Sequence, residues 1–323
     1  MRVVFLGTED IGEIALRRLA ESSHKVVLVV TQPDRPKGRG RKIVPGNVKV
    51  TAEELGIPFI QPETVRRAEA RDAILGSSPD IIAVVSYGEY IPASIFDAPP
   101  HKSINVHPSL LPRWRGASPV RHALIAGDDM TGVTVQYIHK RMDAGDILLQ
   151  EEIAIEPDDD HGSLCGRLYP LGAELLVQAL DGLEAGTIRP VPQDESKVTK
   201  APKIEKDDLR LDWARPALDV RNRIRAFSPT PGARAVFRDS DYKILAADRE
   251  FRQTEGQPDP GRVADISDLG PIVACGDAAL VITRLQPPGK NPLSGRDFLN
   301  GYRVEVGERF AGRSEGGSLG NGG

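Results

Sequence analysis

The chain has 323 residues, a length that favours two domains over one. Apolar residues make up 40% of it, enough to bury real cores, and the formal net charge of -4 gives no global sign of nucleic-acid or membrane binding. The two cysteines, Cys165 and Cys275, are far apart, which argues against a disulfide framework and a zinc ribbon.

No apolar run approaches the roughly 20 residues of a membrane-spanning helix. The apolar run at the N-terminus is too short for a signal peptide. We therefore expect a cytoplasmic protein that does not enter membranes.

Short β-rich apolar runs alternate with helical patterns over the first two hundred residues. Strands are predicted at Arg2–Gly7, Val26–Thr31, Asp80–Ser86, Ser103–Val106, Thr131–Tyr137 and Asp146–Ile155, and Thr131–Tyr137 alternates as a half-buried strand does. Helical spacing predicts helices over Ile11–Leu19, Val48–Leu55 and Leu164–Leu183, with Pro170 expected to kink or restart the last one. Buried strands separated by helices are typical of a parallel α/β sheet.

From about Arg189 to Asp208 the chain turns polar and proline-rich, which predicts a linker. A short helix is predicted over Leu218–Ile224. Short strands typical of a small barrel or sandwich then follow at Ala235–Phe237, Tyr242–Ala246, Gly261–Ile266, Pro271–Cys275 and Ala279–Leu285. We therefore place one domain at residues 1–188, a linker at 189–208, a second domain at 209–311 and a disordered tail at 312–323.

The segment Ser103–Pro112 places polar groups at the end of a predicted strand. Asn105 and His107 stand two residues apart, so both side chains leave the same face of that strand. Ligands bind at the carboxyl ends of parallel strands, although a lone Asn and His in such a place are more often turn residues. Pro108 turns the backbone outward. Ser109 lacks the glycine-flanked elbow of a hydrolase nucleophile, so that role is rejected.

Two further segments carry chemistry that the residues alone leave open. Met142–Asp146 supplies the carboxylates of Asp143 and Asp146 around a small, flexible pair, which also suits an acidic turn. The turn Gly7–Gly12 lacks the three-glycine dinucleotide pattern, so a nucleotide-binding oxidoreductase is disfavoured. No histidine has the spacing of a metal ligand, so no metal is expected.

One strong charge cluster occurs, between a predicted strand and a predicted helix. We call it the basic cluster, and its members are Arg35, Lys37, Arg39, Arg41 and Lys42. Its glycines predict a mobile loop that stays out of any core. Such a run is either solvated surface or a set of salt-dependent phosphate contacts, and by itself it does not say which.

In combination, these segments resemble the formyltetrahydrofolate-dependent transferases. The signature is Asn105-x-His107-x-Ser109-Leu110-Leu111-Pro112 with Asp143 further along in Met-Asp-Ala-Gly-Asp. The branch that uses a tRNA acceptor is indicated by Thr31–Pro36 with the basic cluster, Ser86–Gly88, Arg113–Ala117, Ala201–Ile204, Leu211–Trp213, Ile224–Phe227 and Leu285–Lys290. The chain departs from the family pattern at Glu9–Ile11, Lys200 and Thr230.

The resemblance implies a Rossmann-like, mostly parallel sheet with helices on both faces, followed by a small C-terminal OB-like β-barrel. It implies that Asn105, His107 and Asp143 catalyse formyl transfer from 10-formyltetrahydrofolate, the formyl-donor co-substrate, to the α-amino group of initiator methionyl-tRNA. Folate contacts are carried over to Ser86, Tyr87, Gly88, Ile91, Ser109, Leu110, Leu111 and Pro112. The basic cluster would contact the tRNA, and we expect a monomer.

Rival functions share parts of this pattern. An N-formyltransferase acting on a nucleotide-linked amino sugar uses the same three residues and can carry a related C-terminal domain. A non-catalytic RNA-binding protein would give no reason to keep all three, and a formyltetrahydrofolate hydrolase would need neither the basic cluster nor the barrel. The basic cluster favours tRNA as the acceptor.

Overall fold

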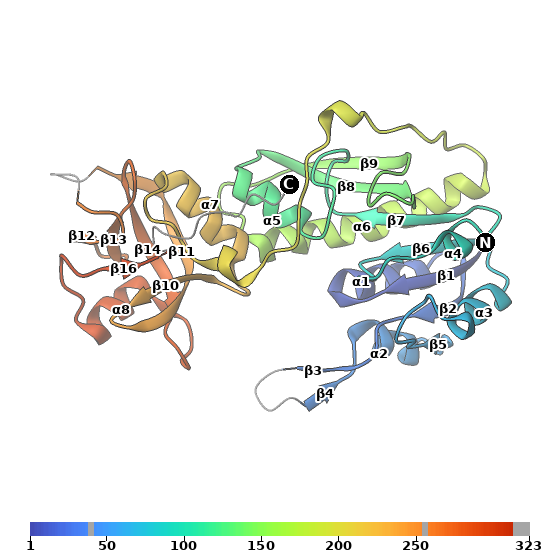
Figure 1. Ribbon diagram of the computed structural model, residues 1–323, viewed down its shortest axis with the longest axis horizontal. Helices are drawn as coiled ribbons and strands as arrows, with labels where there is room; N and C mark the ends of the chain where they lie inside the picture. Colours follow the sequence, from blue (N-terminus) through green and yellow to red (C-terminus); the bar gives the residue numbers. More distant parts are fainter. Residues whose placement is uncertain (38–41, 254–257, 313–323) are drawn as a thin grey trace. The chain divides into compact units, whose positions relative to one another are not determined.

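The protein is described by a computed structural model that covers residues 1–37, 42–253 and 258–312 (Figure 1). It divides into two compact units. The first consists of Met1–Pro119, Met130–Ala154 and Cys165–Pro202, and the second of Val120–Asp129, Ile155–Leu164 and the chain from Lys203 onward. The predicted domain bounds stay predictions, and the predicted disordered tail lies, from residue 313, outside the described residues.

The first unit is built around a sheet in the order β5-β2-β1-β6-β7-β8-β9 (Figure 1). Pairing is parallel from β5 to β7 and antiparallel from β7 to β9. The Rossmann-like, mostly parallel sheet predicted from the sequence is thereby confirmed. Its strands are β1 (Arg2–Gly7), β2 (Lys25–Val30), β5 (Phe59–Ile60), β6 (Ile81–Val85), β7 (Ser103–His107), β8 (Met130–Tyr137) and β9 (Ile147–Ala154).

Helices cover both faces of this sheet. On one face, Val4 and Val84 pack with Ile74 and Ile95 of two short helices. On the other face, Gly172 of a long helix lies against Val106 and Val133. The helices of the chain up to residue 184 are α1 (Glu9–Ala20), α2 (Asn47–Glu54), α3 (Ala68–Gly76), α4 (Ala93–Phe96), α5 (Pro119–Ala126) and α6 (His161–Glu184).

Two details differ from the sequence prediction. Pro170 lies inside α6, which continues through it and is not restarted there. Strand β8 is buried from Thr131 to Gln136 rather than on alternate residues. The reason is that α6 covers one of its faces, while the loop after β7 covers the other, where the Leu110 side chain lies against Gly132.

The second unit holds an antiparallel sheet in the order β12-β13-β14-β11-β10-β16, with β15 paired to β14. Register shifts between β11 and β14 bend this sheet around an aromatic core that includes Phe237, Phe298 and Phe310, which fits the predicted OB-like barrel. Its elements are α7 (Ala217–Phe227), β10 (Ala233–Phe237), β11 (Ser240–Arg252), β12 (Val263–Ile266), β13 (Pro271–Ala274), β14 (Ala279–Gln286), β15 (Leu293–Ser294), α8 (Gly295–Tyr302) and β16 (Phe310–Ala311).

A small two-stranded ladder, which the sequence did not predict, carries part of the basic cluster. Strand β3 (Arg35–Lys37) pairs antiparallel with β4 (Lys42–Val44), and Figure 1 shows the two strands projecting below β2 and α2.

Across all the described residues, no helix combines the length and apolar character needed to cross a membrane.

Candidate active site

The C-terminal end of β7 carries Asn105 and His107. In the register with β8 they lie opposite Gln136 and Thr134, so all four residues occupy one face of the sheet, as the strand period predicted. The Asn105 side chain is half-buried. Among the described residues it has no hydrogen-bond partner, so its amide is available to a ligand.

His107 is buried, and each of its ring nitrogens faces an oxygen. Nε2 lies 2.9 Å from the backbone carbonyl of Trp114, and Nδ1 lies 3.7 Å from Oδ1 of Asp143. The first contact is a hydrogen bond and the second is longer than one. The ring is thus held between the Trp114 carbonyl and the Asp143 carboxylate, with Nε2 at hydrogen-bond distance and Nδ1 facing the carboxylate.

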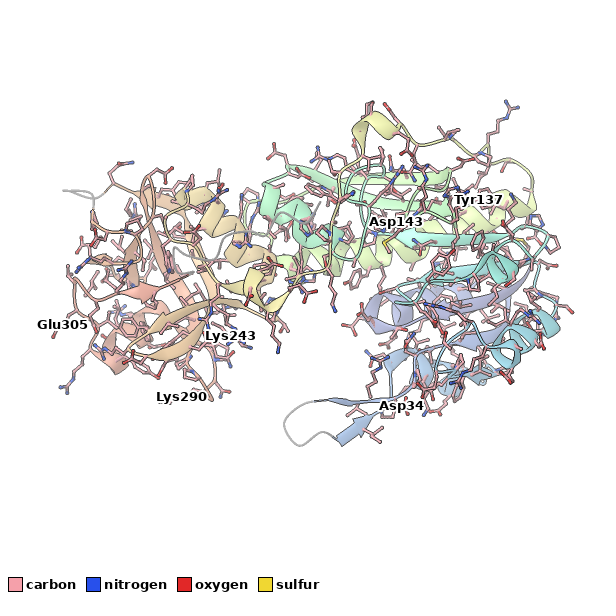
Figure 2. The ribbon with its side chains drawn as sticks, viewed as in Figure 1. Asp34, Tyr137, Asp143, Lys243, Lys290 and Glu305 are labelled. Atoms are coloured by element: carbon pink, nitrogen blue, oxygen red, sulfur yellow. The ribbon has the colours of Figure 1, made fainter. Side chains whose placement is uncertain are left out.

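Asp143 lies on the loop between β8 and β9, beyond Tyr137 at the end of β8 (Figure 2). Its backbone takes a positive φ of 51°, which is uncommon outside glycine. The backbone N–H of Gly116 donates to Oδ2 at 2.8 Å, and Nε2 of Gln136 donates to Oδ1 at 3.3 Å. The structure thus brings together the three residues that the sequence singled out.

The first predicted folate segment, Ser86–Ile91, follows β6. Strand β6 lies beside β1, and the chain adds β2 and β5 on one side of β1 but β6 and β7 on the other, so the order of the strands reverses at this point. Ligands bind at such positions in open α/β sheets. Ser86 and Gly88 both have positive φ, 50° and 80°, and the Ser86 hydroxyl donates to Glu9 at 3.0 Å. The Tyr87 and Ile91 side chains are buried, so this segment offers a ligand mainly its backbone and Ser86.

The second predicted folate segment, Ser109–Pro112, is held in place by Thr134. The Thr134 hydroxyl donates to the carbonyl of Ser109 at 2.7 Å and accepts from the N–H of Leu111 at 3.1 Å. Ser109 and Leu111 are buried, whereas Leu110 and Pro112 keep exposed surface. We infer that the latter two are better placed to touch a ligand.

The structure describes only part of the basic cluster. Arg35 is exposed and donates to Gln32 at 3.2 Å. The backbones of Lys37 and Lys42 are opposite each other in the antiparallel β3–β4 ladder. Arg39 and Arg41 lie outside the described residues.

Two glutamines and a glycine near Asp143 were missed by the sequence analysis. Gln136 and Gly116 donate to its carboxylate, and Gln193 donates to its backbone carbonyl at 2.9 Å. Gln136 carried no signal that reveals a buried partner, because the alternation of the strand placed it on the polar side. Gln193 carried no such signal, since it stands in a polar segment that is typical of a linker.

Family models match both parts of the chain. Residues 1–180 match the model described as formyl transferase, and residues 203–303 match the model of the formyl transferase C-terminal domain. Methionyl-tRNA formyltransferase of Pseudomonas paraeruginosa is 43% identical over 96% of this chain and 98% of its own length. The enzyme of that name from Bacillus velezensis is 41% identical over 95% of this chain and 96% of its own length.

The chain belongs to the formyl transferase family, among the methionyl-tRNA formyltransferases. Solved structures share the fold at lower identity. An N-formyltransferase from Helicobacter canadensis, in complex with folinic acid and dTDP-3-aminofucose, is 16% identical with a TM-score of 0.65, covering 89% of this chain and 99% of its own. HypX from Aquifex aeolicus, in complex with tetrahydrofolic acid, is 20% identical with a TM-score of 0.61, covering 95% of this chain and 48% of its own.

Proposed function

We propose that the protein transfers a formyl group from 10-formyltetrahydrofolate to the α-amino group of initiator methionyl-tRNA. The observation that carries this proposal is the constellation of Asn105, His107 and Asp143. It occurs in a chain that matches methionyl-tRNA formyltransferases over nearly its whole length. No metal is needed for this reaction.

The chemistry joins the amine nitrogen to the formyl carbon and breaks the bond from that carbon to N10 of the folate. An α-amino group titrates near pH 7.7–8.0, so a useful fraction is neutral and nucleophilic at cellular pH. The main demand on the enzyme is the negative charge that develops on the formyl oxygen. The amine also loses one proton, and N10 gains one.

Each of the three residues meets part of this demand. The free amide of Asn105 donates a hydrogen bond to the developing oxyanion, and a single preorganised donor of this kind contributes about 2.7–4 kcal/mol. The His107 imidazolium adds positive charge nearby. Asp143 holds and stabilises that imidazolium and takes the proton that the attacking amine loses.

Binding of the two substrates is proposed for separate surfaces. The backbone and hydroxyl groups of Ser86–Gly88 would read the edges of the pterin, and Leu110 and Pro112 would supply apolar contact. The basic cluster and the OB-like barrel would hold the tRNA through its phosphates. We further propose that the protein acts as a monomer in the cytoplasm.

The test of this function is one assay with 10-formyltetrahydrofolate and two acceptors offered separately. The expected result is formylmethionine on charged initiator tRNA and no formylation of a nucleotide-linked amino sugar. Formylation of the amino sugar alone would establish the rival N-formyltransferase. Absence of transfer to both, with retained RNA binding, would favour a non-catalytic RNA-binding protein.

A further inference from the structure

Gln193 lies in the segment predicted to be a linker, yet its side chain reaches the loop that carries Asp143. Its amide nitrogen lies 2.9 Å from the carbonyl of Asp143, 2.7 Å from the carbonyl of Gly145 and 3.1 Å from Oε1 of Gln136. The two N–H groups of one primary amide are therefore shared among three acceptors, of which two are carbonyls of the Asp143 loop.

Arg115 fixes the orientation of that amide. The Gln193 oxygen accepts from Nε of Arg115 at 3.0 Å and from Nη2 at 2.8 Å. A guanidinium can only donate and a carbonyl oxygen can only accept. If the amide were flipped, its NH₂ group would face the Arg115 donors and its oxygen would face the backbone carbonyls. Arg115 is itself held by Glu195, whose Oε1 lies 3.0 Å from Nη2.

The loop on which Gln193 acts has little freedom in this conformation. Asp143 has positive φ, and a Cβ at Gly145 would lie 1.8 Å from the carbonyl oxygen of Tyr137. A backbone of this kind persists only when its surroundings over-determine it. Gln193 supplies donors to the carbonyls on either side of Ala144, and through Gln136 it is also linked to the Asp143 carboxylate.

The segment that contains Gln193 also holds Trp114, whose carbonyl contacts the other ring nitrogen of His107. The Thr199 hydroxyl accepts from the N–H of Trp114 at 2.8 Å, and the Thr199 carbonyl accepts from the N–H of Arg115 at 2.9 Å. The Trp114 carbonyl is the oxygen that His107 Nε2 contacts. The segment from Gln193 to Thr199 therefore contacts both loops that surround the imidazole.

We propose that Gln193 is a positioning residue for formyl transfer, which holds the Asp143 loop so that the carboxylate faces His107. This inference rests on the proposed function, because it assigns a role within that same site. Gln193 acts through Asp143 and is not expected to touch either substrate.

The test compares three variants of the full chain. Gln193→Met keeps the side-chain length and removes every hydrogen bond, whereas Gln193→Glu keeps the acceptor for Arg115 and replaces the donor by an oxygen. The matched control is Gln178→Met, which removes an exposed glutamine on α6 whose amide contacts only Glu174 among the residues that the structure describes. We expect kcat to fall about 10- to 100-fold in both Gln193 variants, because loss of a supporting contact misplaces the group that it holds. The KM for each substrate should change less than about threefold.

Two further measurements separate positioning from general destabilisation. In an Asp143→Ala background, Gln193→Met should lower the residual kcat less than about twofold, because residues that act as one unit are not additive. Gln193→Met should unfold at a lower temperature than Gln178→Met, because it leaves partly buried acceptors and the Arg115 donors without a partner, but both variants should be fully folded at the assay temperature. A kcat within twofold of wild type, or a full further loss in the Asp143→Ala background, would overturn the positioning role.

One readout does not depend on the reaction. The N–H of Gly116 donates to Oδ2 of Asp143 at 2.8 Å, so its amide resonance in a ¹H–¹⁵N spectrum reports where the carboxylate lies. We expect Gln193→Met to move this resonance upfield and Gln178→Met to leave it in place. If it moves while wild type transfers no formyl group, the proposed function fails, and only the hold of Gln193 on the Asp143 carboxylate stands. An unmoved resonance contradicts the positioning role.

Discussion

At the scale of single residues, the site combines one unoccupied donor with one fully engaged pair. Asn105 has no partner among the described residues, so no hydrogen bond within the protein has to break before its amide meets the oxyanion. His107 and Asp143 are held by Trp114 and Gly116, which stand close together on one turn. The Asn105 donor is thus free to meet the substrate, while the His107 ring and the Asp143 carboxylate are already held in place, as preorganised catalysis requires.

Replacing either of two residues tests this division of roles. We expect Asn105→Ala and Asp143→Ala each to lower kcat by about 10²–10³-fold, because each removes a group that acts on the transition state. Initial rates with saturating 10-formyltetrahydrofolate and charged tRNA measure the effect.

The fold should survive both changes, since Asn105 makes no side-chain hydrogen bond among the described residues and Asp143 is on a loop. Circular dichroism and thermal unfolding are the controls. Near-normal turnover by either variant would remove that residue from the proposed mechanism.

At the scale of elements, tight loops after the strands decide which groups reach the site. Thr134 of β8 fixes Ser109–Pro112 through hydrogen bonds to two backbone groups of that loop. Gln150 of the neighbouring strand β9 adds contacts to the Thr134 hydroxyl at 2.7 Å and to the Leu111 carbonyl at 3.0 Å. The antiparallel strands therefore do more than extend the sheet, because they hold the predicted folate loop in place.

The first residue of α6 gives the second unit a pH-dependent stability. Burial lowers the pKa of His161 from 6.5 to about 4, and the Arg121 charge acts in the same direction. The unfolded chain takes up a proton below pH 6.5, whereas the folded chain does so only near pH 4. Stability from this group is therefore intact above pH 6.5 and is lost as the pH falls to about 4.

The expected size of that loss is at most about 3 kcal/mol, at 1.36 kcal/mol for each unit of pKa difference. Urea unfolding between pH 7 and pH 4 measures it. The variant His161→Gln should have a flatter dependence on pH over this window than wild type. Equal slopes for the two proteins would show that another group is responsible.

At the scale of the whole molecule, we propose that the reaction and the choice of acceptor belong to different parts of the chain. The residues proposed to be catalytic all lie in the first unit, on and beside β7 and β8. Those residues suit formyl transfer to any primary amine. Selection of a tRNA must come from other surfaces, and the basic cluster is the part of the sequence with the chemistry to contact phosphates.

Neutralising three members of the basic cluster should weaken the salt dependence of the KM for tRNA. We expect the triple replacement Arg39→Ala, Arg41→Ala and Lys42→Ala to raise KM for tRNA. The slope of log(1/KM) against log salt concentration should flatten by about 0.9 for each phosphate that the variant no longer neutralises.

The control is a triple alanine variant of exposed basic residues elsewhere in the first unit, namely Lys25, Arg67 and Arg71. It should leave the slope unchanged. Identical slopes for the two triple variants and wild type would mean that the basic cluster is ordinary solvated surface.

What the sequence alone determined is the chemistry that depends on local geometry. A strand alternates its side chains with period two, so Asn105 and His107 had to share a face, and buried strands alternating with helices had to form a mostly parallel sheet. The burial of β8 on both faces did not follow from its own residues, because α6 and the loop after β7 cover it from distant parts of the chain.

Only the tertiary structure placed Asp143 beside His107 and Gln193 against the Asp143 loop. Those contacts join segments that are far apart in sequence, and they depend on how loops close over a packed sheet. A polar residue such as Gln193 looks the same in a solvated linker as in a hydrogen-bonded segment, because its partners, two backbone carbonyls and the side chains of Arg115 and Gln136, are distant in sequence. The sequence specifies which side chain stands at a position, whereas the tertiary structure determines which groups that side chain contacts.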